Sequence, residues 1–115
     1  MAAACEDGLP NHGLYAELLK QAGSPDGVLE MVWRPGFSAH DQWQVQIQAK
    51  IQSGANVIMH TSYLSDAQLA TAHLTQTDDI AATVRELVNR IGPGARICVL
   101  PEGPLTVPYV AVPAL

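Results

Sequence analysis

The chain has 115 residues, enough for one compact domain with a single core and too few for two ordinary domains. Eleven acidic residues against six lysines and arginines give a formal net charge of -5, which argues against nucleic acid or an anionic membrane as a partner. No apolar run approaches the roughly 20 residues that span a bilayer, and the first residues lack the basic head of a signal peptide, so we expect a cytoplasmic protein.

The first part of the chain predicts one short strand and two helices. Residues 2–5 are an apolar run that reads as the first strand. Apolar residues spaced four apart predict a helix over residues 14–22, and Gly23 ends it. Ser24 is expected to be the N-cap of a second helix over residues 25–33, whose first residue is a proline.

Residues 43–52 fit two different structures. Apolar and polar residues alternate strictly here, which is typical of a strand, whereas the glutamine, lysine and alanine content favours a helix with Asp41 as its N-cap. In a helix the apolar residues divide into two opposite faces, with Trp43, Ile47 and Ile51 on one and Val45 and Ala49 on the other. A helix therefore requires burial on two sides, and the pattern alone leaves both structures open.

The next part predicts a strand and two further helices. Residues 56–59 are an apolar run of the length expected for a strand buried on both faces. Helices are expected over residues 66–72 and 78–91, because Ser65 and Thr77 are good N-caps and the longer segment carries an apolar stripe.

Residues 96–100 complete the pattern as a third strand. Strands separated by helices indicate parallel pairing, because a parallel neighbour needs a crossover connection. We therefore expect a single α/β domain over residues 1–115, with a small, mostly parallel sheet of about three strands flanked by helices in a Rossmann-like layering.

The chain ends and the cysteines give two further expectations. Residues 105–115 carry no charge, which predicts an exposed apolar surface that another domain or subunit covers. Cys5 and Cys98 match neither a disulfide framework nor a metal-binding spacing, so both are expected to be reduced and mostly buried.

Several polar residues follow the predicted strands. Ligands of parallel α/β sheets collect beyond the carboxyl ends of the strands. That rule places Glu6 and Asp7 after the first strand, His60 and Ser62 after the second, and Glu102 after the third. These five residues could share one rim and perform acid–base chemistry. The plainer interpretation is that they are ordinary turn, cap and strand-end residues.

Trp43 is a separate candidate. It lies among polar neighbours near the start of its element, so it is either a core residue or an aromatic wall of a ligand cavity. The four histidines show no metal-binding spacing, and we expect no metal site within this chain.

Two stretches are specific enough to suggest a family. HDQWQVQ at residues 40–46 and GPGARICVLPEGPLTVPY at residues 92–109 resemble the carboxyl-terminal domain of the nickel-dependent lactate racemases. CEDG at residues 5–8 and VIM at residues 57–59 lie where that family has comparable elements. The resemblance covers nearly the whole chain, and it makes residues 41–52 helical.

The resemblance implies a two-domain enzyme with its active site between the domains. In that family a nickel-pincer nucleotide, tethered to a lysine of the amino-terminal domain, accepts a hydride from a 2-hydroxy acid, and histidines of the same domain move the proton. Only Trp43 carries over here, as an aromatic that faces substrate and cofactor. The resemblance thus implies no catalytic residue, metal or cofactor on this chain alone. It also implies an amino-terminal catalytic domain, or a second subunit, as partner and a small 2-hydroxy acid as substrate.

Three functions follow from these observations. The first is the carboxyl-terminal, substrate-facing part of a lactate racemase-like 2-hydroxy-acid racemase or epimerase, inactive as an isolated fragment. The second is a non-catalytic α/β interaction module. The third is a small acid–base enzyme that uses His60 with Glu6, Asp7 or Glu102.

Overall fold

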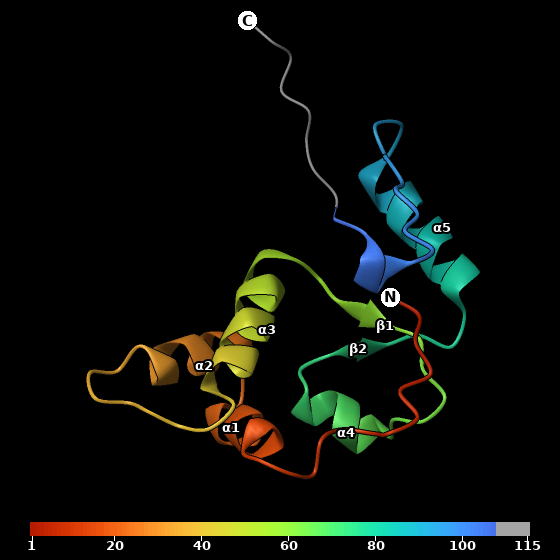
Figure 1. The fold of residues 1–115 in the computed structure, drawn as a ribbon. Coiled ribbons are helices and arrows are strands. Elements are labelled where there is room, and N and C mark those ends of the chain that lie inside the picture. The colour runs from red at the N-terminus through yellow and green to blue at the C-terminus, as the bar shows by residue number, and fades with distance from the viewer. Residues whose placement is uncertain (108–115) are drawn as a thin grey trace, which may run out of the picture. The chain divides into compact units, whose positions relative to one another are not determined.

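The computed structural model describes residues 1–107 of the chain (Figure 1). The chain divides into two compact units, Met1–Thr83 and Val84–Leu115. Most of the regular secondary structure belongs to the first unit. No helix within the described residues combines the length and apolar character needed to cross a membrane.

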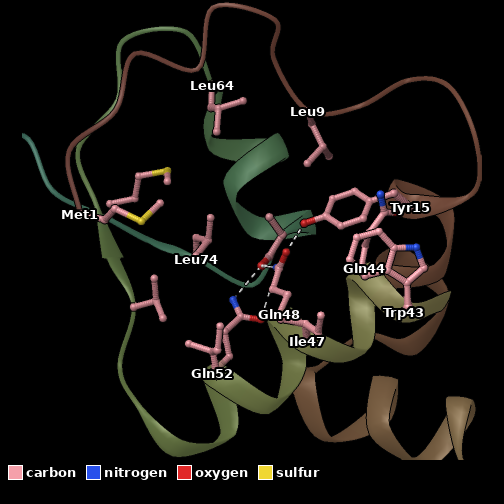
Figure 2. A pocket seen from close by; sticks show the side chains of 14 residues that line it. Met1, Leu9, Tyr15, Trp43, Gln44, Ile47, Gln48, Gln52, Leu64 and Leu74 are labelled. Atoms are coloured by element: carbon pink, nitrogen blue, oxygen red, sulfur yellow. Dashed lines mark hydrogen bonds between the residues drawn. The ribbon is translucent and has the colours of Figure 1, made fainter. Parts of the chain in front are cut away.

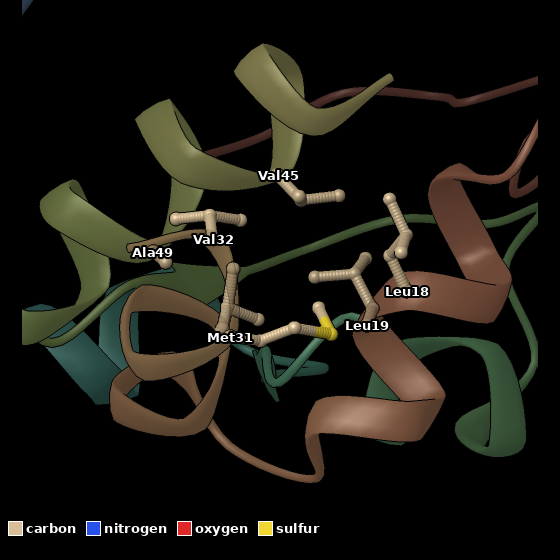
Figure 3. Packing of buried hydrophobic residues seen from close by; sticks show 7 residues of the cluster. Leu18, Leu19, Met31, Val32, Val45 and Ala49 are labelled. Atoms are coloured by element: carbon tan, nitrogen blue, oxygen red, sulfur yellow. The ribbon is translucent and has the colours of Figure 1, made fainter. Parts of the chain in front are cut away.

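Helices α1, Tyr15–Ala22, and α2, Pro25–Val32, match their predicted ranges to within one residue at each end. Gly23 closes α1 in the left-handed conformation with φ 71°, which glycine adopts without strain. Ser24 caps α2, because its side chain accepts a hydrogen bond from the Gly27 N–H at 3.0 Å. These helices and α3, Gln42–Gly54, enclose the main core (Figure 3), which consists of Leu18, Leu19, Val28, Met31, Val32, Val45 and Ala49.

Helix α3 resolves the ambiguity over residues 43–52 in favour of the helix. Val45 and Ala49 face the core and are fully buried. Asp41 precedes the helix with φ 64°, but its side chain does not cap α3. Instead, Asp41 Oδ2 accepts a hydrogen bond from the backbone N–H of Leu14 at 2.8 Å and so joins the starts of α3 and α1.

The sheet of the first unit has two parallel strands joined by a helix. Strand β1, Ile58–Met59, pairs with β2, Thr75–Gln76, and Ile58 lies opposite Thr75. Helix α4, Asp66–Thr71, makes the crossover between them, and Ser65 caps it in a capping box, as expected. A parallel α/β arrangement is therefore confirmed, with two strands in the described residues.

Three strand predictions need correction. The expected first strand over residues 2–5 is reduced to one parallel bridge between Ala2 and His60. Strand β2 was not expected, because its two polar, exposed residues give no apolar signal. Residues 96–100 form no strand, and their apolar side chains are exposed, so the three-stranded, Rossmann-like layering is not observed.

Helix α5, Ile80–Ile91, begins in the first unit and continues into the second. It starts two residues later than expected. Asp79 rather than Thr77 caps its first turn, because Asp79 Oδ1 accepts a hydrogen bond from the Ala82 N–H at 2.8 Å. The second unit also contains a short 3₁₀ helix, η1, Gly103–Leu105.

The prediction for the cysteines is only partly correct. Both are free, and Cys5 is partly buried, but Cys98 is exposed because residues 96–100 do not enter a sheet. Of the uncharged carboxyl-terminal stretch, Leu105 and Val107 are exposed. Residues 108–115 lie outside the described part, so the prediction for them is untested.

Candidate functional site

An apolar pocket of about 500 Å³ lies wholly within the first unit (Figure 2). One wall is a face of α3, formed by Trp43, Gln44, Ile47, Gln48, Ile51 and Gln52. The rest comes from segments far apart in sequence, namely Met1, Leu9, Tyr15, Val57, Met59, Leu64, Ala72 and Leu74. The pocket is therefore a tertiary feature that unites the amino-terminal segment, α3 and the sheet.

The two faces of α3 have different environments. Val45 and Ala49 have no exposed surface, whereas Trp43, Ile47 and Ile51 are 64%, 52% and 56% exposed. The large apolar side chains on this second face thus lie on the open side of the helix and line the pocket instead of a sealed core. Because the opposite face is packed, α3 holds Trp43 on a rigid support.

The polar side chains of the pocket wall are mostly engaged with the protein itself. Gln48 Nε2 donates to the Ala72 carbonyl at 2.8 Å, and Gln52 Nε2 donates to the same carbonyl at 2.9 Å (Figure 2). The Tyr15 hydroxyl donates to Gln48 Oε1. The amides of α3 therefore fix the segment after α4 and leave apolar surface toward the cavity.

Two groups of the wall have unusual environments. Partial burial removes water from the Tyr15 hydroxyl, and this desolvation raises the pKa of Tyr15 above its ordinary value. Gln44 Oε1 is buried, and within the described residues it accepts no hydrogen bond. Gln44 thus brings a buried hydrogen-bond acceptor, without a partner in residues 1–107, into the wall that also contains Trp43, its neighbour in the sequence.

The polar residues predicted to share a rim do not line this pocket. His60 is half-buried, and its Nδ1 donates to the Thr77 carbonyl at 2.8 Å, because a carbonyl can only accept. Glu6, Asp7 and Ser62 are exposed, and in residues 1–107 neither a hydrogen bond nor an ion pair joins the two carboxylates to His60. Glu102 is exposed in the second unit.

The bridge between Ala2 and His60 does bring two of the predicted strand ends together. The His60 N–H donates to the Met1 carbonyl at 2.9 Å, and the buried Thr61 hydroxyl donates to the Ala4 carbonyl at 2.8 Å. His60 and Thr61 therefore anchor the amino-terminal segment that carries Glu6 and Asp7.

The resemblance assigns the nickel-pincer nucleotide to an amino-terminal domain and not to this chain. No group of three or more histidine, cysteine, aspartate or glutamate side chains in residues 1–107 could hold a metal ion. The pocket wall offers no thiolate, imidazole or carboxylate.

Of the candidate residues predicted from the sequence, Trp43 lines this pocket, and most of the other lining residues were not predicted. The four-residue spacing of Trp43, Ile47 and Ile51 was the available signal, since it defines a second apolar face on a helix. No local signal marks Leu9, Leu64 or Leu74, because they reach the pocket only through the tertiary fold.

Two comparisons with known proteins relate the chain to lactate racemases. The profile of the lactate racemase C-terminal domain family matches residues 1–107. A curated lactate racemase from Thermoanaerobacterium thermosaccharolyticum is 27% identical over 105 residues, which are 90% of this chain and 24% of that protein. The chain thus spans about a quarter of the length of the curated relative it matches. None of the solved structures compared with the chain matches it.

Proposed function

The chain belongs to the lactate racemase C-terminal domain family, and on that premise we propose that it is the substrate-facing part of a 2-hydroxy-acid racemase or epimerase. The observation that carries the proposal is the family match over residues 1–107. The placement of Trp43 supports it, because the indole is largely exposed and lines a cavity.

Trp43 would form one wall of the substrate cleft. A tryptophan ring offers a large, rigid contact surface at a small cost in conformational entropy. Here the ring projects from α3, whose opposite face is anchored in the core by Val45 and Ala49. This support would keep the indole in place against a substrate, which positioning for catalysis requires.

The remaining catalytic parts would come from outside this chain. We propose that an amino-terminal catalytic domain, or a second subunit, binds the nickel-pincer nucleotide and provides the groups that move the proton. That cofactor would supply reversible hydride acceptance when bound. The isolated chain is therefore expected to be inactive, because one wall of a cleft cannot align the reacting groups.

The test is a chimera in which this chain replaces the matching quarter of the Thermoanaerobacterium lactate racemase. Loaded with nickel-pincer nucleotide, the chimera should interconvert the enantiomers of a 2-hydroxy acid, as measured by chiral chromatography. Trp43→Ala should lower kcat by about tenfold or more, because it removes the aromatic contact at the reaction site. Trp33→Ala is the matched control, since Trp33 is 62% exposed and lies outside the pocket wall.

Two results would contradict the proposal. One is a folded, loaded chimera that interconverts no 2-hydroxy acid. The other is equal activity of the Trp43→Ala and Trp33→Ala proteins, which would remove Trp43 from the reaction site.

An interaction module is the second candidate, favoured by exposed apolar side chains in the second unit. Ile97, Val99 and Leu105 are 65%, 76% and 82% exposed, and such surface in a folded protein commonly marks a protein contact. Sedimentation of the chain alone and mixed with the remaining part of the racemase tests this candidate: a chain that stays monomeric in both cases is not an interaction module. Association together with no turnover in the loaded chimera would favour the interaction module over the racemase. The acid–base enzyme has less support, because no hydrogen bond or ion pair within the described residues joins His60 to Glu6, Asp7 or Glu102.

A further inference from the structure

The chemistry of the pocket beside Trp43 restricts what can occupy it. No lysine, arginine, histidine, aspartate or glutamate side chain lines the wall. The amides of Gln48 and Gln52 are engaged with backbone carbonyls and are not available to a ligand as donors. The Met1 ammonium in the wall donates to the Ile58 carbonyl at 2.7 Å, and the Gln44 amide lies beside Trp43. Away from these two groups, a carboxylate would lose its hydration among isoleucine, leucine and valine side chains without a compensating partner. The occupant of this space is expected to be uncharged and apolar.

The size of the pocket sets a second restriction. Its volume of about 500 Å³ lies within the range of small-molecule sites, roughly 300–1,000 Å³. A methyl group occupies only a small part of such a space and would leave most of the apolar wall in contact with water. A branched aliphatic or an aromatic group covers much more of the wall, and binding strengthens with the apolar area removed from water.

Polar side chains occur along the α3 wall, but those of Gln48 and Gln52 are engaged with the protein itself. Gln44 follows Trp43 in the same wall and carries the buried Oε1 acceptor that has no hydrogen-bond partner among the described residues. Farther along α3, Ile47 and Ile51 continue the wall with apolar side chains. Ile47 and Ile51 thus extend the apolar wall of the pocket away from Trp43.

We propose that this pocket receives the side chain of the substrate, so that the substrate is a 2-hydroxy acid with a bulky apolar side chain rather than lactate. The carboxylate and the reacting carbon stay on the Trp43 side, outside the apolar extension. This inference rests on the proposed function, since only that function places a 2-hydroxy acid against Trp43.

The first experiment uses the 115-residue chain with ¹³C-labelled methionine methyl groups. The chain has three methionines: Met59 and Met1 line the pocket, and Met31 lies in the main core as an internal control. 3-Phenyllactate and 2-hydroxyisocaproate should shift the Met59 methyl signal and leave the Met31 signal unchanged. Lactate at equal concentration should shift neither signal.

Matched variants locate the binding. Ile47→Gln places a polar side chain on the pocket wall, whereas Ile80→Gln makes the same change at an exposed position outside it. Both isoleucines are largely exposed, at 52% and 46%, so both variants should fold. The Met59 shift with 3-phenyllactate should be lost in Ile47→Gln and kept in Ile80→Gln. An unchanged shift in Ile47→Gln, or no shift in the parent chain, overturns the proposal.

The second experiment measures substrate preference in the chimera. The kcat/KM for 3-phenyllactate should exceed that for lactate. Ile47→Gln should lower the ratio of these two values by about tenfold, whereas Ile80→Gln, outside the pocket, should leave both values unchanged. Turnover with a preference for lactate would overturn the substrate assignment and leave the proposed function intact. A Met59 shift in a chimera that turns over no hydroxy acid would overturn the proposed function and retain the pocket assignment.

Discussion

Gly13 and Asp41 meet where the starts of α1 and α3 are joined. Gly13 has φ +70°, a conformation that side chains rarely adopt, and a Cβ at this position would overlap Asp41 Oδ2. That oxygen is the acceptor for the Leu14 N–H at the start of α1. Gly13→Ala should therefore combine backbone strain with loss of this hydrogen bond and lower the free energy of unfolding by about 2–3 kcal/mol.

Gly23→Ala separates the two effects. Gly23 has nearly the same φ, +71°, but nothing lies within 4 Å of the position its Cβ would take. This variant should show the strain alone, about 1–2 kcal/mol in urea unfolding. Equal losses for the two alanine variants would mean that the contact between Gly13 and Asp41 contributes nothing to stability.

Tyr15 should make stability depend on pH at the alkaline end. Its burial raises the pKa of the folded state, so the protein keeps the phenolic proton where the unfolded chain begins to lose it, near pH 10. The free energy of unfolding should therefore fall as the pH rises from about 10 through the folded-state pKa. Below that range the contribution is fully present.

Tyr15→Phe provides the test of this pH dependence. It should cost about 1 kcal/mol near neutral pH, because the hydrogen bond to Gln48 is lost, and the difference from wild type should shrink above pH 10. Tyr63→Phe, at a position 58% exposed, is the control and should follow the wild type. A constant difference between Tyr15→Phe and wild type across the alkaline range would contradict the role given to Tyr15.

At the scale of the element, α3 should show two faces with different energetic roles. Val45→Ala removes methyl groups from a fully buried position in the core and should lower the free energy of unfolding by about 1–3 kcal/mol. Ile47→Ala, two residues away on the half-exposed face, should change it by less than about 0.5 kcal/mol. Urea denaturation of both variants measures the contrast. A large loss for Ile47→Ala would mean that this face is part of the core and not a pocket wall.

Elements with local start and stop signals were predictable from the sequence. Gly23, Ser24 and Ser65 act through their own conformation or through a neighbour three residues away, so they mark α1, α2 and α4 without knowledge of the fold. The alternation over residues 43–52 left strand and helix both open because α3 is apolar on two sides, which cancels the usual signature of a one-sided helix. Resemblance to a family, not periodicity, identified this helix.

Strands and the pocket depended on partners that the sequence does not reveal. Thr75 and Gln76 are polar and exposed, and they are a strand only because β1 pairs with them. Trp43 was identified as a candidate site residue, whereas Leu74 and Met59 could not be joined to it before the sheet and α3 were placed. Strand pairing and burial that depend on residues far apart in the chain are therefore hard to predict from a single sequence.

At the scale of the whole molecule, the second unit contains surface that a complete family member is expected to cover. Ile97 and Val99, more than half exposed, flank the exposed free thiol of Cys98. The curated relative is about four times as long as the matched region, so most of such a protein lies outside this chain. Covered apolar side chains would lose contact with water and stabilise the assembly.

Thiol labelling tests whether this surface is covered. In the isolated chain Cys98 should react with a maleimide quickly, because its side chain is open to solvent, and the partly buried Cys5 should react more slowly. In the chimera, the Cys98 rate should fall by about tenfold or more if the added part of the protein packs against residues 97–99. Cys98→Ser isolates the signal of Cys5 and corrects for it. An unchanged Cys98 rate in a folded, active chimera would show that these residues stay open to solvent, so the contact between the parts would have to use other surface.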